Sequence, residues 1–377
     1  MTDGTIWSDD DRRWMERALT IARLGEGRTA PNPPVGAVLV NTGKIVGEGF
    51  HAKAGEPHAE IFALRQAGDR ARGAVAYVTL EPCAHHGRTP PCTEALIRAG
   101  VARVVIGCED PNPRVQGGGA HLLEAAGIDV QSGLCKIECR RLIAPFAHHV
   151  STGRPFTTLK AAVTLDGKTA TSTGQSQWIS SEPARQEAHR LRNSVDAIMV
   201  GIDTAIEDDP KLTTRGIEDG RDPLRVVVDS TLRLPLESAI LHVASPSPTL
   251  IATTGKAPQA RIDAARATGA EVVVFEGDDD SRVDLEALWK ALGEREVQHL
   301  LVEGGATLNQ AVLESGLAQR MMVILCPLML GGDDAPGIFR GRGVGKLNDA
   351  VRLTGLRARP CGPDVIIEGE VEPCSLD

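Results

Sequence analysis

The feature that most constrains the fold is a repeated alternation of short apolar segments with segments of helical periodicity. Apolar segments at 35–40, 75–80 and 103–107 alternate with helical patterns, and the alternation resumes after residue 156. Such alternation is typical of an α/β structure, in which helices cover a sheet. At 377 residues the chain is longer than one hydrophobic core usually serves, so we expect two domains.

Capping and turn signals place the first elements more closely. Ser8, followed three residues later by Asp11, forms a capping-box pattern and predicts the start of a helix. The turn at 41–44 joins two apolar segments into a predicted hairpin. Further helices are predicted over 58–67 and 92–99, because a glycine follows each of them.

A change of composition marks the expected boundary between the domains. The segment HHVSTGRPF (148–156) has the small and polar residues of a linker, which divides the chain into domains 1–149 and 150–377. The second domain repeats the α/β pattern, with helices at 182–193 and 306–315. Its predicted strands lie at 156–163, 196–201, 224–229, 271–275, 299–305, 320–326 and 364–371.

Composition excludes several classes of protein. A net charge of −9 opposes nucleic-acid binding, which needs a basic surface; an anionic small substrate would need local positive contacts. No apolar segment approaches the roughly 20 residues of a membrane span. The acidic start lacks the apolar core of a signal peptide, so we expect a cytoplasmic protein. Its eight cysteines are then thiols or metal ligands rather than disulfides.

Four residues form a pattern that predicts metal chemistry. His58, Cys83 and Cys92 offer one imidazole and two thiolates, and three ligands leave the fourth tetrahedral position of a zinc ion open for water. Zinc lowers the pKa of such a water toward ~7. Glu60 lies two residues after the histidine and would move the proton from that water to a departing amine. This H-x-E…P-C pattern is the signature of zinc deaminases.

Two alternatives remain open for these residues. A structural zinc site normally has four protein ligands, and His85 or His86 would supply the fourth. The His and Cys residues could also be unrelated to one another. Both alternatives leave Glu60 without a role.

Longer motifs in the first half carry a family resemblance. They are PNPPVGAVLV (31–40), HAE (58–60), TLEPCAHHGRTPPC (79–92) and DPNPRVQGGG (110–119). In these motifs the chain resembles the bifunctional deaminase–reductases of riboflavin biosynthesis. The resemblance implies a cytidine-deaminase-like three-layer domain that removes the 2-amino group of 2,5-diamino-6-ribosylamino-4(3H)-pyrimidinone 5′-phosphate. It also implies that Asn32, His51, His85 and Arg88 contact this substrate.

Residues alone say less about the second half. It contains no G-x-G-x-x-G after a strand, so the common dinucleotide fingerprint is absent. The segment 341–346 resembles a P-loop but lacks its first glycine and its final Ser or Thr, so we interpret it as an exposed glycine loop. A better phosphate cradle is Val302–Ala306, where two glycines precede a predicted helix.

The same resemblance extends through the second half. Its motifs are LKAAVTLDGKTA (159–170), GQSQWIS (174–180), EDDPKLTTR (207–215), VVVDS (226–230) and VEGGATLNQ (302–310). The resemblance implies a dihydrofolate-reductase-like fold that uses NADPH to reduce the ribosyl group to ribityl.

The resemblance also assigns contacts in this half. Those implied for NADPH are Ala162, Trp178, Thr204, Asp208, Ser230, Gly305, Ala306, Thr307, Leu308, Asn309, Gln310 and Ala311. Those implied for the substrate are Ser176, Arg192, Leu212, Arg215 and Glu303, with Lys160 and Asp166 as candidates near the sugar. Arg192 and Arg215 suit a phosphate, since a guanidinium binds it through two hydrogen bonds.

The preferred interpretation is therefore a bifunctional enzyme that binds one zinc ion per chain and NADPH. It would act on a small phosphorylated pyrimidine and form a homo-oligomer. A deaminase with a non-catalytic second domain is the first alternative. A nucleic-acid base deaminase is the second, and the acidic balance and the 3% aromatic content oppose it.

Overall fold

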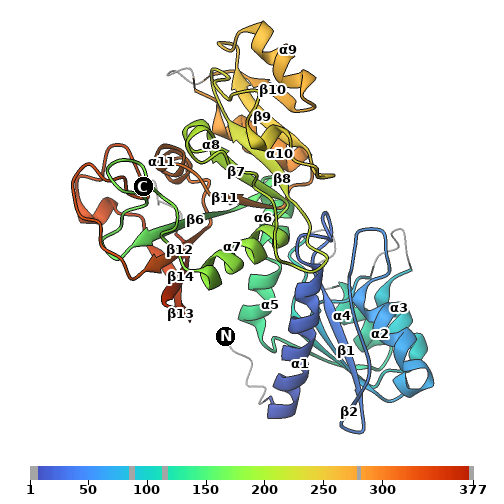
Figure 1. Ribbon diagram of the computed structural model, residues 1–377. Coiled ribbons are helices and arrows are strands. Elements are labelled where there is room, and N and C mark those ends of the chain that lie inside the picture. The colour runs from blue at the N-terminus through green and yellow to red at the C-terminus, as the bar shows by residue number, and fades with distance from the viewer. Residues whose placement is uncertain (1–6, 85–89, 113–117, 278–281, 373–377) are drawn as a thin grey trace. The chain divides into compact units, whose positions relative to one another are not determined.

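The chain, seen here in a computed structural model, forms two compact units (Figure 1). The structure describes residues 7–84, 90–112, 118–277 and 282–372. The N-terminal unit is Met1–Gly153 and the C-terminal unit is Arg154–Asp377. No helix in the described ranges has both the length and the apolar character needed to cross a membrane.

The N-terminal unit is built on a five-stranded sheet with the order β2-β1-β3-β4-β5. Strand β1 runs antiparallel to both β2 and β3, whereas β3, β4 and β5 are parallel. The strands are β1 (Gly36–Asn41), β2 (Lys44–Phe50), β3 (Val75–Leu80), β4 (Arg103–Cys108) and β5 (Asp129–Ser132). The helices are α1 (Asp9–Ala22), α2 (Ala59–Ala67), α3 (Cys92–Ala99), α4 (Gly118–Ala125), α5 (Lys136–Leu142) and α6 (Ala144–Thr152).

Helices cover both faces of this sheet. Successive side chains of a strand point to opposite faces, so apolar residues on both faces need a covering layer. Val38 and Tyr77 pack with α1 and α5 in one buried cluster. Their neighbours Leu39 and Val78 pack with α2, α3 and α4 in another. The unit is thus the expected three-layer structure.

The local signals of this unit are confirmed. Ser8 and Asp11 form the predicted capping box at the start of α1. The hairpin turns through Thr42 and Gly43, both at positive φ. His58 and Gly68 are the caps of α2. That helix lies against β2 so closely that a Cβ at Gly47 would be 2.1 Å from the Ala63 carbonyl oxygen, which only glycine allows.

The C-terminal unit is built on a nine-stranded sheet with the order β10-β9-β8-β7-β11-β6-β12-β14-β13. The seven strands from β10 to β12 are parallel to one another. Strand β14 runs antiparallel to both of its neighbours, β12 and β13. The strands are β6 (Phe156–Thr164), β7 (Ala197–Gly201), β8 (Leu224–Val228), β9 (Thr249–Thr254), β10 (Glu271–Phe275), β11 (His299–Val302), β12 (Arg320–Cys326), β13 (Leu353–Cys361) and β14 (Asp364–Val371).

Helices again cover both faces. Met199 and Val226 pack with α10 and α11, and Ile198 and Val227 pack with α8 and α9. The helices are α7 (Glu182–Ser194), α8 (Ile202–Asp208), α9 (Gln259–Ala267), α10 (Leu285–Glu294) and α11 (Ala306–Glu314). Strands β5, β9 and β13 were not anticipated.

The prediction of a linker over 148–156 is wrong for most of its length. Helix α6 continues to Thr152, and the predicted boundary at 149/150 falls inside it. Pro145 at its start and the buried Phe146 favour the helix despite its polar end. Gly153 ends the helix at φ 72°, and the two compact units divide directly after this glycine.

Candidate active sites

The predicted zinc ligands of the N-terminal unit lie together. One potential ligand atom from each of His58, Cys83 and Cys92 lies within 4.8 Å of the other two. The Nδ1 atom of His58 is 3.5 Å from Cys83 Sγ and 3.3 Å from Cys92 Sγ. Among the residues that the structure describes, only these three form such a group. An imidazole and two thiolates suit zinc and leave one tetrahedral position open.

The local structure explains how these residues converge. His58 caps α2, Cys83 follows β3, and Cys92 is the first residue of α3. The backbone N–H of Cys92 donates a hydrogen bond to Cys83 Sγ at 3.3 Å. The hydrogen bond with the Cys92 thiol outweighs burial and, together with the hydrogen bond with His58, lowers the pKa of Cys83. Cys83 is therefore poised as a thiolate.

Glu60 lies beside the ligands in the first turn of α2. Its side chain is buried, with 3% of the residue exposed. Burial, followed by the negative charge of Cys83, raises the pKa of Glu60. A raised pKa makes the Glu60 carboxylate a stronger base than an ordinary carboxylate, which suits proton transfer in a deamination.

Two of the four predicted substrate contacts of this unit lie next to the same site. His51 is buried, and its ring is edge-on to that of His58 at 5.3 Å. Its Nε2 is 3.1 Å from Asn32 Nδ2, and its Nδ1 is 3.2 Å from the Pro57 carbonyl oxygen. Burial lowers the pKa of His51, which favours a neutral ring. His85 and Arg88 lie outside the described residues.

Sequence reasoning missed one buried carboxylate near this site. Glu81 accepts hydrogen bonds at 3.0 Å from the N–H groups of Gly119 and Ala120, at the start of α4. It thereby joins the segment that carries Cys83 to α4. A glutamate in the TLEPC motif was visible, but its partners were not, because they lie 38 and 39 residues further along the chain.

The C-terminal unit contains a cavity of about 800 Å³. Most of the predicted cofactor and substrate residues line it. They are Lys160, Ala162, Ser176, Thr204, Asp208, Ser230, Glu303, Gly305, Ala306, Thr307, Leu308, Asn309 and Ala311. The cavity size suits a large cofactor or substrate.

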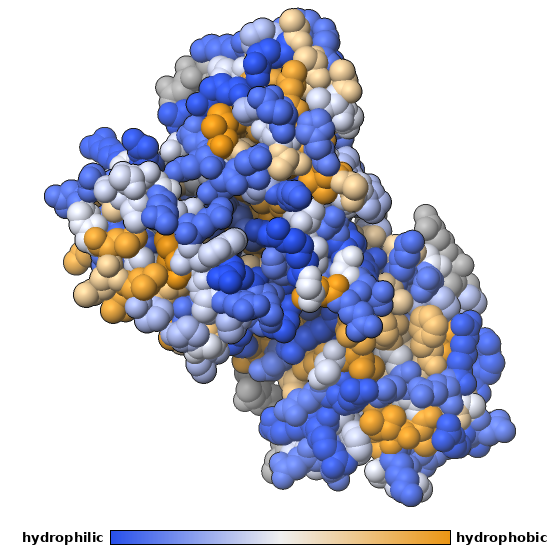
Figure 2. All heavy atoms as spheres, in the orientation of Figure 1, coloured by the Kyte–Doolittle hydropathy of each residue, from blue (hydrophilic) through white to orange (hydrophobic). Residues whose placement is uncertain are grey.

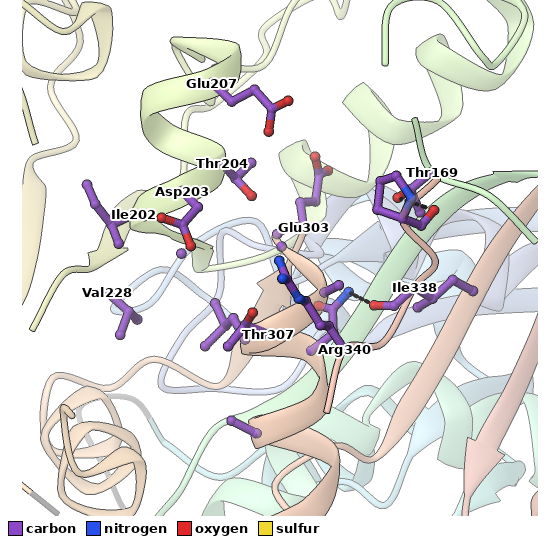
Figure 3. Close-up of a pocket in the computed structure, with 18 of the residues that line it drawn as sticks. Thr169, Ile202, Asp203, Thr204, Glu207, Val228, Glu303, Thr307, Ile338 and Arg340 are labelled. Atoms are coloured by element: carbon purple, nitrogen blue, oxygen red, sulfur yellow. Dashed lines mark hydrogen bonds between the residues drawn. The ribbon is translucent and has the colours of Figure 1, made fainter. Parts of the chain in front are cut away.

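The predicted cradle is the turn between β11 and α11. Gly305 has φ 54°, and a Cβ there would lie 3.1 Å from Thr204 Oγ1. The N-cap of α11 is Gly305, which has no side chain to cap the helix. Ala306 and Thr307, the first residues of α11, line the cavity, and Figure 3 shows Thr307 there. The N–H groups of an uncapped helix N-terminus bind anions.

Glu303 lies directly before this cradle in a buried ion pair. Its carboxylate accepts hydrogen bonds from Arg192 Nε at 3.1 Å and Arg192 Nη2 at 2.6 Å. Although burial opposes ionisation, the positive charges of Arg192 and Lys160 lower the pKa of Glu303 to about 2. Glu303 is therefore held as a carboxylate at the cavity wall.

Several predicted residues do not line the cavity. Trp178 is 65% exposed and lies under the guanidinium of Arg185. The guanidinium of Arg192 faces Glu303 and the Thr213 carbonyl oxygen. The others are Leu212, Arg215 and Gln310. Asp166 accepts hydrogen bonds from Thr164 Oγ1 and from the N–H groups of Leu330 and Gly331, so it stabilises a turn.

Comparisons with known families match both units. Residues 8–108 match the zinc-binding region of cytidine and deoxycytidylate deaminases. Residues 155–367 match the RibD C-terminal domain. The predicted fold class is confirmed by these matches and by the two mixed sheets.

Relatives align along nearly the whole chain. The riboflavin biosynthesis protein RibD of Aquifex aeolicus is 41% identical over 357 residues, which cover 95% of this chain and 97% of that protein. The RibD protein of Escherichia coli K12 is 42% identical over 369 residues, 95% of this chain and 98% of its own.

Solved structures agree with these relatives. Acinetobacter baumannii RibD has a TM-score of 0.82 and 38% identity, covering 96% of this chain and 99% of that one. A diaminohydroxyphosphoribosylaminopyrimidine deaminase/5-amino-6-(5-phosphoribosylamino)uracil reductase from Thermotoga maritima has a TM-score of 0.82 and 33% identity, with the same coverage. The chain thus belongs to the RibD family of riboflavin biosynthesis proteins, as a bifunctional enzyme with a zinc-binding deaminase domain and a reductase domain.

Proposed function

We propose that the N-terminal unit hydrolyses the 2-amino group from 2,5-diamino-6-ribosylamino-4(3H)-pyrimidinone 5′-phosphate. The C-terminal unit then reduces the ribosyl group of the product to ribityl with NADPH. The observation that carries the first step is the buried Glu60 beside a ligand set with one open position. Among the described residues only His58, Cys83 and Cys92 offer ligands. A structural zinc site, which has four protein ligands, would leave the buried Glu60 without a role.

Glu60 is the proton carrier of the deamination. Zinc held by His58, Cys83 and Cys92, one ion per chain, would supply hydroxide at neutral pH by lowering the pKa of a water ligand. The Glu60 carboxylate accepts a proton from the attacking water, whose oxygen bonds to C2 of the pyrimidine, and passes this proton to the 2-amino group. The C2–N bond then breaks and the nitrogen leaves as ammonia. Asn32 and His51 hold the pyrimidine and its sugar phosphate beside Glu60.

The second reaction requires hydride transfer to C1′ and a proton for the sugar ring oxygen. Bound NADPH would supply the hydride. The fit of the cavity to this cofactor rests on its volume, on the uncapped start of α11 and on the positive φ of Gly305. Lys160 and Glu303 hold the sugar, and the Lys160 ammonium donates the proton to the ring oxygen.

The ion pair gives Arg192 a different part in this proposal from the phosphate contact implied by the resemblance. With two donors on Glu303, the Arg192 guanidinium orients that carboxylate toward the sugar. Arg215, which is exposed, remains available for the substrate phosphate.

One assay tests both reactions. The purified chain is incubated with the diaminopyrimidine ribotide, with and without NADPH, and ammonia and NADPH are followed separately. We expect ammonia in both mixtures and NADPH oxidation only after deamination. Ammonia release without NADPH oxidation would favour a deaminase with a non-catalytic second domain.

Zinc content tests the ligand assignment. Cys83→Ser and Cys92→Ser should each lose most of the bound zinc, whereas Cys135→Ser, at a free cysteine outside the group, should retain it. Near-stoichiometric zinc in both ligand variants would contradict the assignment.

Cofactor preference tests the assignment of NADPH. The preference over NADH follows from the family resemblance, with Ser230 and Thr204 as candidates near the 2′-phosphate. Comparable kcat/KM values for the two cofactors would contradict it.

We further propose that the chain forms a homo-oligomer. Apolar side chains gather on the visible face of the C-terminal unit over the segments that follow β12 (Figure 2). In the chain segments that follow β12, Met329 is 74% exposed and Leu347 is 89% exposed. Exposed apolar patches of this kind commonly form interfaces, and sedimentation of the purified chain tests this. The cytoplasmic location stays a prediction.

A further inference from the structure

The cavity of the C-terminal unit presents an electrostatic problem. Its lining contains eight acidic and four basic residues, yet its proposed cofactor carries phosphate groups. An anion enters such a cavity only where local positive groups offset the acidic ones. The basic residues are Lys160, Arg233, Arg282 and Arg340.

Three of these cations already have partners. Lys160 lies close enough to Glu303 to lower the pKa of that carboxyl. Arg233 Nη2 is 2.6 Å from Asp203 Oδ1. Arg282 also has an interaction partner. Arg340 differs, because none of the carboxylates that the structure describes pairs with its guanidinium.

The backbone on both sides of Arg340 is fixed to α11. The Arg340 N–H donates to the Ala306 carbonyl oxygen at 3.1 Å. Two residues before Arg340, the Ile338 carbonyl oxygen accepts a hydrogen bond from Asn309 Nδ2 at 3.1 Å. On the other side, a Cβ at Gly341 would lie 3.0 Å from Gln310 Cγ, so this glycine packs tightly on the helix. Arg340 is therefore held in register with the first turn of α11.

Its side chain points to the cradle. Figure 3 shows Arg340 reaching past the start of α11 into the cavity, on the same side as Thr307. The uncapped N-terminus of this nine-residue helix supplies N–H donors there. A guanidinium next to such donors suits a diphosphate, which it binds through two parallel hydrogen bonds.

We propose that Arg340 binds the diphosphate of the nicotinamide cofactor together with the first turn of α11. This inference rests on the proposed function of the cavity as the NADPH site. It separates two phosphate positions. The diphosphate lies at α11, whereas the 2′-phosphate lies toward Ser230 at the end of β8.

The test compares two cofactors that share a diphosphate and differ in the 2′-phosphate. Dissociation constants of NADPH and NADH for the full chain are measured by fluorescence titration for Arg340→Ala and Arg340→Lys. Because a hydrogen-bonded charge contact is lost, we expect Arg340→Ala to weaken both cofactors by the same factor, on the order of 10-fold. Arg340→Lys should lose less, since it retains the charge.

Control measurements show whether weaker cofactor binding is specific to Arg340. Arg342→Ala removes an exposed arginine that does not line the cavity, and it should leave both dissociation constants unchanged. The KM of Arg340→Ala for the deaminated ribotide should also be unchanged. Matched thermal melts exclude a folding defect, which is not expected for an exposed side chain.

Three outcomes would overturn the proposal: weaker NADPH binding with unchanged NADH binding, a change only in the KM for the ribotide, or no change. Gly305→Val, titrated in parallel, separates this proposal from the function on which it rests. If Gly305→Val weakens NADPH binding and Arg340→Ala does not, only the role of Arg340 is wrong. If Gly305→Val leaves NADPH binding unchanged, the cradle itself is misassigned and both fail.

Discussion

The two sites of this protein are built in opposite ways. The candidate zinc centre uses side chains of particular chemical type, and its predicted ligands His58 and Cys92 lie 34 residues apart in the sequence. The cofactor cavity uses the backbone of one helix start and side chains that come from positions as far apart as Lys160 and Arg340. The predicted zinc ligands are side chains of particular types within a short segment of the sequence. Contacts from backbone N–H groups to a phosphate, by contrast, can be made by almost any residue type.

This difference explains why the sequence pattern alone predicted the zinc site but not the cofactor site. A zinc ion accepts few ligand types, so His, Cys and Cys with a nearby Glu form a specific pattern. A phosphate accepts any N–H group at a helix start, so many sequences can provide it. Two glycines before a helix are therefore a much less specific signal for a phosphate site than two cysteines and a histidine are for a zinc site.

The largest expected effect concerns Glu60, whose loss should disable one site and spare the other. Glu60→Gln should retain zinc but lose ammonia release on the order of 10²-fold or more, because an amide cannot carry the proton. It should still oxidise NADPH when given the deaminated ribotide. Glu124→Gln, an exposed glutamate on α4, is the matched control. Loss of both activities in a well-folded Glu60→Gln protein would mean that the two sites are not independent.

The next effect concerns the backbone cradle. Gly305→Val should weaken NADPH binding on the order of 10²-fold, because a β-branched residue is strained at φ 54° and its Cβ would crowd Thr204. Ammonia release should be unchanged. Gly343→Val serves as the control, since no atom lies within 4 Å of its Cβ position. Equal NADPH affinities in the two variants would contradict the cradle.

A smaller effect is expected for the ion pair behind the cavity. Burial would raise the pKa of Glu303, and its lowered value depends on the charges of Arg192 and Lys160. Arg192→Gln should therefore raise that pKa and move the acid limb of the reductase kcat/KM profile to higher pH by about one unit or more. We expect kcat/KM at neutral pH to fall on the order of 10-fold.

The control for this variant is Arg190→Gln on the same helix, which removes an exposed arginine paired with Glu187. A loss of reductase activity in Arg192→Gln with no shift of the acid limb would argue for a direct phosphate contact instead.

The smallest effect concerns stability rather than activity. His299 is buried in β11, and its Nε2 is 2.9 Å from Thr158 Oγ1. Burial, and then the charge of Arg320, lower the pKa of His299 to about 3. Its folded-state pKa lies below the ~6.5 of an unfolded histidine, so the unfolded chain binds the proton first. The free energy of unfolding of the C-terminal unit should therefore fall as the pH drops below ~6.5, by at most about 1.4 kcal/mol per pH unit.

His299→Gln should reduce this pH dependence, and His242→Gln, at an exposed histidine, should not. Denaturant titrations at pH 7 and pH 5.5 measure the difference. An identical pH dependence in the wild type and His299→Gln would show that the buried imidazole does not contribute.

Some features of the fold and of the sites were predicted from the sequence, and others were not. Hairpin, caps and zinc ligands were predicted, because each depends on neighbours within a few residues or on a chemically restrictive pattern. The end of α6 was missed, because its polar residues resemble a linker and the features that favour the helix, Pro145 and the buried Phe146, lie at its start. Arg340 was not among the predicted residues, because its place beside α11 depends on a hydrogen bond to the distant Ala306.

The sequence by itself determined the α/β class and pointed to His58, Cys83, Cys92 and Glu60 as one group, since these follow from local periodicity and from the few side chains that zinc accepts. Tertiary structure decided which charges meet. It placed Arg192 on Glu303, separated Trp178 from the cavity wall, and brought Arg340 to the start of α11. Charges interact through space with little regard to their separation along the chain, so their partners emerge only when the sheet order brings distant segments together.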